Sequence, residues 1–383
     1  AMGLYIPNKT LDGKVVRRVT AFLKPFGENA APSMLKANRD VSVIGSFILG
    51  KGFVFEDDAP DATPLSEMRR LLASDTRHGD RIRKYLGGED LNSNPRQDSN
   101  RYVIDFGEMT LEEARAWPEL LAIVERKVKP ARARVQQRDR REEWWRHATR
   151  SGPFRSFVAA SGRALATSQT TTHLSFSFVG ADVVLSHSSV ILLLDAFTAF
   201  SVVQSRVHVR WAGLLGSSMK EDLRYTPTDC FETFPFPQPN PRAAMPALEN
   251  VGQRLYDARA KYMLDEQVGL TTTYNRLKDP AETERRIVDL RRLHEEMDAA
   301  VLHAYGWDDI QVPPICAASP ADQKALDVFE TEVIDRLFLL NANRADEERL
   351  AVSTARPSLR DAVPKPRRPR GKKQDDGAQG NLL

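Results

Sequence analysis

The spacing of hydrophobic residues in the middle of the chain predicts a small sheet. In THLSFSFV at 172–179, apolar and polar side chains alternate with a period of two, which is typical of a strand with one buried and one polar face. The apolar positions are Leu174, Phe176 and Phe178, and the polar positions are His173, Ser175 and Ser177. RALATSQ before this segment and DVVLSHSSVILLL after it extend the predicted sheet over 163–194. Strands are also predicted within 41–55, which is rich in β-branched and aromatic residues.

Helical spacing precedes this sheet. A helix is predicted near 64–73, and a second one at 110–128, where Thr110 and Glu113 have the spacing of a capping box. A further helix is predicted through 131–148, after a proline that should end or kink the second one.

Helical spacing returns after the sheet. One helix is predicted at 197–215, and a proline-rich connector follows at 234–246. Two amphipathic stripes come next, made of Leu248, Val251, Leu255, Ala258 and Tyr262, and of Leu290, Leu293, Met297 and Val301. Another helix is predicted at 320–345. The fold class is therefore α+β, with small mixed sheets followed by a helical bundle and, from about residue 353, a basic tail too polar to pack.

Length and composition narrow the class of protein. The 383 residues suffice for two domains, and no apolar run reaches the roughly 18 residues that cross a bilayer. Cys230 and Cys316 have no neighbouring thiol or histidine at metal spacing, which fits a reducing compartment. We expect a cytoplasmic protein with no membrane contact and no metal site.

Positive charge is concentrated in one segment. Residues 126–150 contain ten Lys or Arg against three Asp or Glu, a balance of +7 in a chain whose total is +3. Such a run can bind the phosphates of DNA or RNA, or it can be a solvated helix whose Trp144 and Trp145 anchor it to the core. The candidate phosphate-binding residues here are Arg132, Arg134, Arg138, Arg141, Arg146 and Arg150.

Short polar side chains in and around the predicted sheet could contact base edges. Candidates are Ser168, Gln169, Thr170, Thr171, Thr172, His173, Ser175, Ser186, His187 and Ser188. The alternative is that the polar group at 186–189 marks a strand end exposed to water.

Signatures of enzymes are missing. No dinucleotide-binding glycine motif, phosphate-binding loop or nucleophile elbow occurs, and Val312-Pro313-Pro314-Ile315 lacks the polar and aromatic ends of a base-gripping loop. Glu125 and Lys127 could be half of a nuclease site, but a solvated helix face explains them better. We expect no catalytic residue in this chain.

Several ordered segments resemble a known family. They are YLGGEDLNSNP (85–95), RYVIDFG (101–107), WPELLAIVERKVKP (117–130), REEWWRHA (141–148), DLRYTPTDCFETFPFP (222–237), GLTTTYNRLKDP (269–280) and LHEEMDAAVLHAYGWDD (293–309). Their order resembles the carboxy-terminal half of MmeI-like type IIL restriction-modification enzymes and related adenine-N6 DNA methyltransferases. The likeness runs from about residue 10 to residue 345.

The resemblance implies a DNA target recognition domain at 61–238 and a helical domain at 239–352, with residues 1–60 joining them to an absent methyltransferase domain and a disordered tail at 353–383. It adds Lys220 and Arg224 to the phosphate contacts, and Trp144, Trp145 and Tyr225 as supporting residues. The partners implied are double-stranded DNA and a methyltransferase domain or subunit, in a system of phage defence. The cofactor S-adenosylmethionine would bind to that absent part, and none would bind to this chain.

Two other interpretations are open. The chain could be an assembly or specificity subunit of a phage-defence methyltransferase complex with incidental DNA contact, or a self-sufficient enzyme with an unfamiliar site. The sequence gives neither the target sequence nor the oligomeric state.

Overall fold

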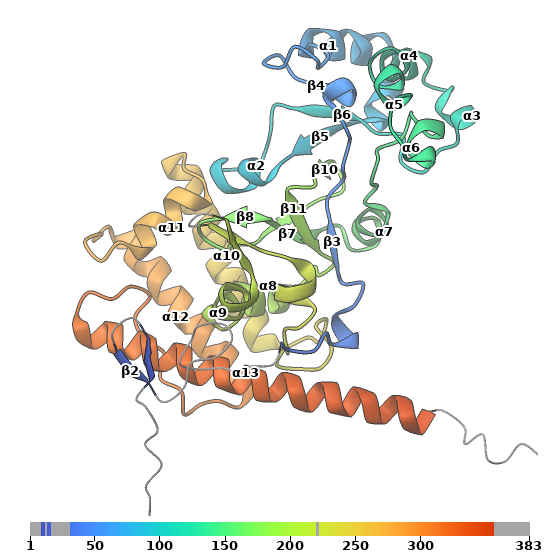
Figure 1. The fold of residues 1–383 in the computed structure, drawn as a ribbon. Helices are drawn as coiled ribbons and strands as arrows, with labels where there is room; N and C mark the ends of the chain where they lie inside the picture. Colours follow the sequence, from blue (N-terminus) through green and yellow to red (C-terminus); the bar gives the residue numbers. More distant parts are fainter. Residues whose placement is uncertain (1–8, 12–13, 17–30, 220–221, 356–383) are drawn as a thin grey trace, which may run out of the picture.

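Small sheets lie between two groups of helices in this chain (Figure 1). The structure is a computed structural model that describes residues 9–11, 14–16, 31–219 and 222–355. A hairpin of β1 (Lys9–Leu11) and β2 (Lys14–Val16) is the first described element. Because the sheets are separate and most of their strand pairs are antiparallel, the predicted α+β class is confirmed.

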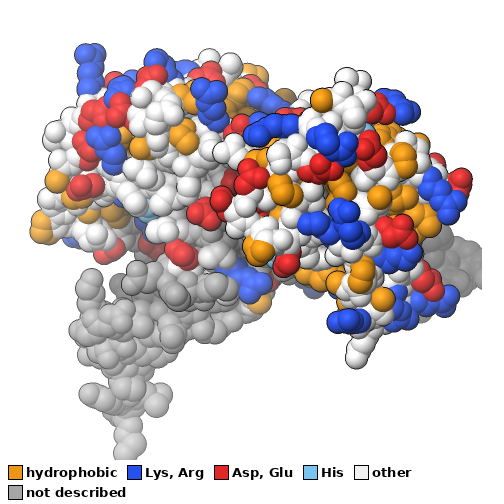
Figure 2. Space-filling view, turned by 90° about the horizontal axis from the view of Figure 1, so that it is seen from above, with side chains coloured by type: hydrophobic (Ala, Val, Ile, Leu, Met, Phe, Trp, Pro, Cys, Tyr) orange, Lys and Arg blue, Asp and Glu red, His pale blue; other side chains and the backbone are white. Residues whose placement is uncertain are grey.

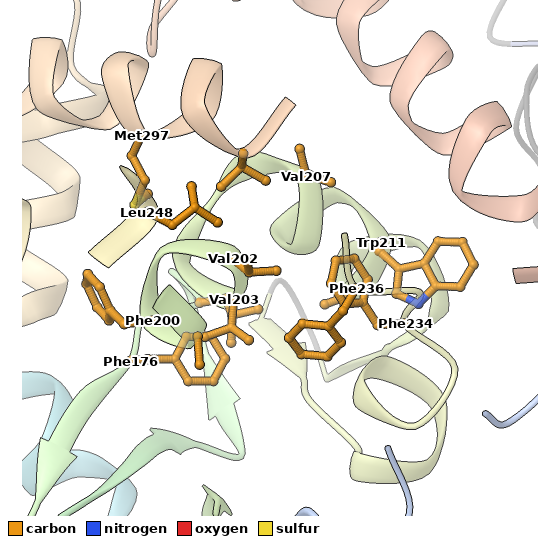
Figure 3. Close-up of a cluster of buried hydrophobic side chains, with 14 of the residues drawn as sticks. Phe176, Phe200, Val202, Val203, Val207, Trp211, Phe234, Phe236, Leu248 and Met297 are labelled. Atoms are coloured by element: carbon orange, nitrogen blue, oxygen red, sulfur yellow. The ribbon is translucent and has the colours of Figure 1, made fainter. Parts of the chain in front are cut away.

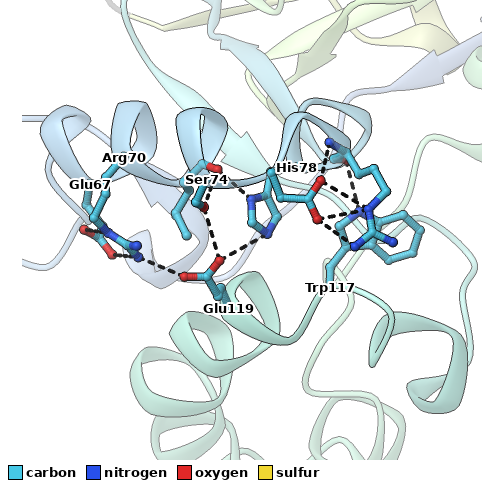
Figure 4. Close-up of polar contacts among 9 residues, drawn as sticks. Glu67, Arg70, Ser74, His78, Trp117 and Glu119 are labelled. Atoms are coloured by element: carbon cyan, nitrogen blue, oxygen red, sulfur yellow. Dashed lines mark hydrogen bonds and ion pairs between the residues drawn. The ribbon is translucent and has the colours of Figure 1, made fainter.

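The first sheet has the strand order β10-β5-β6-β4. Its strands are β4 (Val54–Phe55), β5 (Ile82–Leu86), β6 (Tyr102–Ile104) and β10 (Val183–Leu185), and only β10 is parallel to its neighbour. Helices α1 (Leu65–Ser74) and α4 (Pro118–Lys127) share a hydrophobic core with this sheet. Glu119 of α4 also faces Arg70, Ser74 and His78 from α1 and the short helix after it, η3 (Thr76–Asp80), as Figure 4 shows. These polar contacts fix α4 against α1.

The segment 163–194, predicted to form one sheet, supplies three strands of the second sheet and one strand of the third. The second has the order β3-β11-β7-β9, and the third has the order β12-β13-β8. Their strands are β3 (Ser42–Ile44), β7 (Ala164–Ser168), β9 (Ser177–Val179), β11 (Ser189–Leu192), β8 (Thr170–Thr171), β12 (Ser217–Met219) and β13 (Asp222–Arg224). The helices beside them are α2 (Gly88–Ser93) and α7 (Gly152–Ser161). The segment 163–194 thus supplies strands to three sheets and ties them together.

The helices from residue 197 onward contribute to one continuous core (Figure 3). They are α8 (Phe197–Gln204), α9 (Arg206–Leu215), α10 (Pro246–Glu266), α11 (Leu270–Lys278), α12 (Arg285–Tyr305) and α13 (Pro320–Ala355). Phe200 of α8, Leu248 of α10 and Met297 of α12 belong to this core, and Trp211 of α9 packs against Phe338 of α13 with ring centroids 5.1 Å apart. Packing is therefore unbroken across the boundary that the sequence places at residue 238.

Three predicted helices differ from the structure. The helix at 110–128 is interrupted: α3 (Leu111–Ala114) ends before Trp117, and α4 begins at Pro118, since proline is favoured in a first turn. The helix at 131–148 is wrong, because the chain forms only α5 (Lys129–Arg132) and α6 (Arg138–Glu142) there. The helix at 197–215 breaks at Ser205, whose extended backbone separates α8 from α9.

The connector and the tail complete the chain. The connector has no helix or strand before Met245, while Phe234 and Phe236 within it are buried in the core. Helix α13 continues to Ala355, so the first residues of the predicted disordered tail are helical, and residues 356–383 lie outside the described residues. The remaining short elements are η1 (Lys36–Asn38), η2 (Lys51–Phe53) and a π-helix at Pro227–Phe231.

The capping box at Thr110 is confirmed and gives a test of local stability. The Glu113 backbone N–H donates to Thr110 Oγ1 at 3.2 Å, and Glu113 Oε2 accepts from the Thr110 backbone N–H at 2.7 Å. Because Thr110→Ala removes the side-chain cap, it should lower the free energy of unfolding by about 1 kcal/mol in urea titrations. Thr110→Ser keeps the hydroxyl and is the control. Equal stability of both variants would show that packing alone fixes α3.

Candidate nucleic-acid interface

Arg132 is a buried structural residue, which corrects its prediction as a phosphate contact. Only 1% of the residue is exposed. Its guanidinium donates to the carbonyl oxygen of Arg146 at 2.6 Å and to that of Ile48 at 3.0 Å. Burial lowers the pKa of Arg132 to about 10. Because both terminal nitrogens of its guanidinium are bonded to carbonyl groups, Arg132 holds the 126–150 segment against the core.

Arg146 and Arg150 are largely engaged by neighbouring groups. Arg146 donates to the carbonyl oxygens of Met109 and Glu108 at 2.8 and 2.7 Å. Arg150 forms ion pairs with Glu143 at 2.9 Å and with Glu108 at 3.1 Å. A phosphate would have to compete with these acceptors, so neither arginine is a free contact in this conformation.

Among the arginines predicted to bind phosphates in the basic segment, Arg134, Arg138 and Arg141 are exposed. Arg138 pairs with Glu142 at 2.6 Å on a fully solvated surface, where an ion pair contributes little. Arg141 uses one nitrogen, Nη1, to donate to the carbonyl oxygens of two residues in the preceding loop, both at 2.8 Å. The rest of its guanidinium can reach a ligand.

The predicted supporting residues lie inside the protein. Trp144 and Trp145 are 7% and 8% exposed, and their rings meet edge to face with centroids 5.9 Å apart. Trp145 Nε1 donates to the carbonyl oxygen of Met109 at 2.9 Å. Tyr225 is fully buried, and its hydroxyl lies 3.0 Å from His208 Nε2. These aromatic residues anchor the surface segments, and none of them presents a ring to solvent.

The turn between β10 and β11 contains Ser186, His187 and Ser188. Ser186 is buried, and its hydroxyl pairs with that of Ser188 at 2.7 Å. Ser188 Oγ also accepts a hydrogen bond from the Gly88 backbone N–H at 2.9 Å. His187 is exposed at the tip and rests edge to face on Phe47. The two serines therefore shape the turn, and His187 is its accessible side chain.

Gln169 is held by its backbone while its side chain stays accessible. Its N–H donates to the carbonyl oxygen of Ser188 at 2.7 Å, and its carbonyl oxygen accepts from the Tyr225 N–H at 2.8 Å. The side-chain amide is partly exposed and forms no hydrogen bond within the described part of the chain. Thr170 beside it is half-buried, whereas Ser168 is buried and donates to the carbonyl oxygen of Thr170.

Residues 171–173 meet other parts of the chain. Thr171 is buried and accepts from Asn92 of α2 at 3.2 Å, whereas Thr172 is exposed and donates to Asp222 at 2.8 Å. His173 lies between Asn275 and Lys278 of α11, with distances of 2.6 Å to Asn275 Oδ1 and 2.9 Å to Lys278 Nζ. Burial, followed by the charge of Lys278, lowers the pKa of His173.

The predicted polar face of 172–179 is wrong beyond residue 173. Ser175 and Ser177 are each 2% exposed, so Ser175 is no accessible base contact. The strand begins only at Ser177, which pairs in register with Ala166 of β7. Because serine is small and its hydroxyl can bond locally, alternation with serine does not reveal which face meets solvent.

The accessible candidates form what we call the recognition band. It consists of Gln169, Thr170, Thr172, His173, His187 and Arg224. The Gln169–Ser188 hydrogen bond joins the turn of His187 to the end of β7, and Arg224 of β13 is opposite Thr170 of β8 in register. Lys220 lies outside the described residues. The sequence did not single out Asn92, Asn275 or Lys278 individually, although all three lie in segments of the family resemblance.

The face of the molecule drawn in Figure 2 is not uniformly basic. On this face, Lys and Arg side chains alternate with Asp and Glu.

Within the described residues, no group of three or more His, Cys, Asp or Glu side chains could hold a metal ion. In the same residues, no helix combines the length and apolarity that a membrane span needs.

Glu125 and Lys127 of α4 have different surroundings. Glu125 is exposed and pairs with Lys129 at 2.6 Å, as expected for a solvated helix face. Lys127 is half-buried and donates to the carbonyl oxygens of Asp61 at 3.2 Å and Ala62 at 2.6 Å, so it holds α4 against the segment before α1.

Two known proteins are similar to this chain, one in sequence and one in fold. DNA methyltransferase A of Bacillus subtilis (strain 168) is 27% identical over 134 residues, which are 35% of this chain and 14% of that protein. The fold is similar to a solved structure of the type IIL restriction-modification enzyme MmeI in complex with DNA, with a TM-score of 0.61 and 17% identity. That match covers 87% of this chain and 39% of the MmeI chain. Both relatives thus extend far beyond the part that this chain matches.

A family model identifies the part of the chain that carries the recognition band. The model describes the target recognition domain of MmeI and matches residues 62–238, which include every residue of the band. Residues 62–238, a little under half of the chain, are therefore similar to the target recognition domain of MmeI.

Proposed function

We propose that this chain recognises a specific sequence of double-stranded DNA as the target recognition part of an adenine-N6 methyltransferase or type IIL restriction-modification enzyme. The observation that carries the proposal is the match of residues 62–238 to the MmeI target recognition domain. The chain itself supplies no chemistry. It positions a target adenine for a methyltransferase domain or subunit that binds S-adenosylmethionine, within a cytoplasmic defence system against phage.

The physical argument rests on the side chains of the recognition band. The amide of Gln169, the hydroxyl groups of the threonines and the imidazole of His187 can donate to or accept from base edges, which differ between base pairs in the major groove. Thr170 and Arg224 stand on the paired strands β8 and β13, and the backbone of Gln169 is hydrogen-bonded at both its N–H and its carbonyl oxygen, so the backbone that carries these side chains is ordered before DNA binds. Exposed arginines nearby in sequence bind phosphates, which set register and orientation without reading sequence.

The proposal is tested by selecting from a random duplex library with the full chain at near-cellular salt. Sequencing the bound fraction should yield one enriched motif. Enrichment of no motif would leave only charge-driven binding, which has no sequence preference, and would favour the assembly interpretation. A parallel assay with labelled S-adenosylmethionine should show no methyl transfer by the chain alone.

Arg141 provides a test of the phosphate-contacting surface. Arg141→Gln should weaken binding to all duplexes alike and reduce the slope of log affinity against log salt by about 0.9, because one counterion-releasing contact is lost. Fluorescence anisotropy titrations at several salt concentrations measure this slope. Arg115→Gln removes an exposed arginine at the C-terminal end of α3, which pairs with Glu112 at 2.6 Å, and should leave the slope unchanged. A normal slope for Arg141→Gln would place α6 away from the DNA.

A further inference from the structure

A small basic cavity lies where the recognition band meets the helices that follow it. The cavity has a volume of about 100 Å³, and its lining includes His173, Arg206, Arg210, Tyr274 and Lys278. These residues come from the loop after β8 and from helices α9 and α11. The cavity therefore joins a candidate base-reading residue to cations that lie outside the basic segment 126–150.

Lys278 is a cation without a carboxylate partner in the described part of the chain. Its ammonium lies 2.9 Å from His173 Nδ1, and His173 Nε2 lies 2.6 Å from Asn275 Oδ1. Since the amide oxygen can only accept, His173 donates through Nε2 and accepts from Lys278 through Nδ1. An ammonium has three N–H donors, so two of those of Lys278 can reach another acceptor.

The two arginines of the cavity differ in how far they are engaged. Arg206 donates to the buried Asp298 at 2.6 Å and to the carbonyl oxygens of two prolines, which leaves it no free face. Arg210 lies 3.6 Å from Glu330, beyond hydrogen-bonding distance, and 37% of its side chain is exposed. Arg210 can therefore turn towards an anion in the cavity.

We propose that Lys278 and Arg210 bind a phosphate group of the DNA backbone beside the recognition band, and that His173 holds the Lys278 ammonium in place. Helix α11 then belongs to the DNA-binding surface. The helices after residue 238 would contact DNA directly, in addition to supporting the recognition band. This inference rests on the proposed function. An ammonium and a guanidinium around a cavity of this size suit one phosphate group, and a contact so close to His173 would fix the register of the duplex on the band.

The electrostatics of the cavity support an anionic ligand. Burial, and then the charge of Arg210, lower the pKa of Lys278 to about 8. A phosphate would offset the repulsion between the two cations and favour the protonated lysine. The other titratable or charged groups facing this region are His173, Arg206, Asp222, Tyr274, His294 and Glu330.

The first test compares salt dependence among variants of the full chain with a labelled duplex of random sequence. Lys278→Gln should lower the salt slope by about 0.9, whereas Lys278→Arg should retain it. Lys261→Gln is the matched control, because Lys261 is an exposed lysine of α10 paired with Asp265. Circular dichroism melting confirms that each variant is folded. A slope for Lys278→Gln equal to that of the control would overturn the inference.

The second test uses pH to remove the charge of Lys278 while its side chain stays in place. Lys278 is protonated below pH 8 and loses its proton above it, so wild-type affinity for the duplex should fall between pH 7 and pH 9.5 by about the amount that Lys278→Gln loses at pH 7. Lys278→Arg stays charged and should show a smaller fall. Identical pH profiles for the two proteins would contradict the proposal.

Failure of this inference can be distinguished from failure of the proposed function. If the wild type selects a motif from the random library while Lys278→Gln keeps the control slope, the recognition function stands and the phosphate site is wrong. If the wild type selects no motif, the proposed function is wrong whatever Lys278 does.

Discussion

Replacing Arg206 with alanine is expected to lower the free energy of unfolding by about 3–5 kcal/mol, because it leaves the buried carboxylate of Asp298 without its partner. Asp298 is fully buried and accepts two hydrogen bonds from Arg206, one from the backbone N–H at 2.8 Å and one from Nε at 2.6 Å. Without the guanidinium, the carboxylate has no compensating charge, and the carbonyl oxygens of Pro313 and Pro314 lose their donors. Urea unfolding followed by circular dichroism measures the loss.

Two controls separate the buried pair from ordinary loss of a side chain. The double variant Arg206→Ala with Asp298→Asn should regain part of the lost stability, because the amide keeps an acceptor for the backbone N–H and has no charge to bury. Arg292→Ala removes an exposed arginine that pairs with Glu296 on α12 and should cost at most about 1 kcal/mol. A double variant no more stable than Arg206→Ala alone would show that the charge of Asp298 is not the cause.

The location of this ion pair explains how the recognition band is supported. Arg206 begins α9, whereas Asp298 belongs to α12 and the two prolines lie in the loop before α13. Arg259 of α10 makes a similar link, since it donates to the carbonyl oxygen of Phe176 at 2.6 Å and to Gln204 of α8 at 3.2 Å. The helices after residue 238 thus fix the loop that contains His173, and the two parts form one packing unit.

Hydrophobic spacing and capping residues predicted the helices correctly where no distant contact interrupts the local pattern. The helix expected near 64–73 is α1, the capping box at Thr110 forms, and the amphipathic stripes after the connector belong to α10 and α12. The helix expected at 131–148 failed because long-range hydrogen bonds override local spacing. Arg132 donates to the carbonyl oxygen of Ile48, a residue 84 positions away, and no periodicity in the sequence encodes that contact.

The candidate site was predictable by segment, and less so by residue. The segments 168–173 and 186–188 do supply the recognition band, but the sequence gives no means of telling buried hydroxyls such as those of Ser168 and Ser186 from accessible groups such as Gln169. The same holds for arginines of one basic run, where Arg132 is buried and Arg141 is exposed. Whether a polar residue faces solvent depends on contacts with distant parts of the chain, which local spacing does not contain.

Gln169→Ala is expected to relax the base preference at one position of the recognised sequence by about 1–3 kcal/mol. A carboxamide can donate to and accept from the edge of one adenine at the same time, and alanine can do neither. The backbone of Gln169 is hydrogen-bonded at both its N–H and its carbonyl oxygen, so truncating the side chain should leave the loop in place. Selection from a random duplex library with wild type and variant compares the preference at each position.

The control for this experiment is Gln253→Ala, which removes an exposed amide from α10 and should leave the selected motif unchanged. Because Gln169 is assigned to a base edge and not to a phosphate, Gln169→Ala should also keep the wild-type dependence of affinity on salt. Loss of affinity for every duplex with an altered salt slope would instead make Gln169 a backbone contact. An unchanged motif would remove Gln169 from the base-reading set and leave His187, the exposed side chain of the turn between β10 and β11, as the residue to test next.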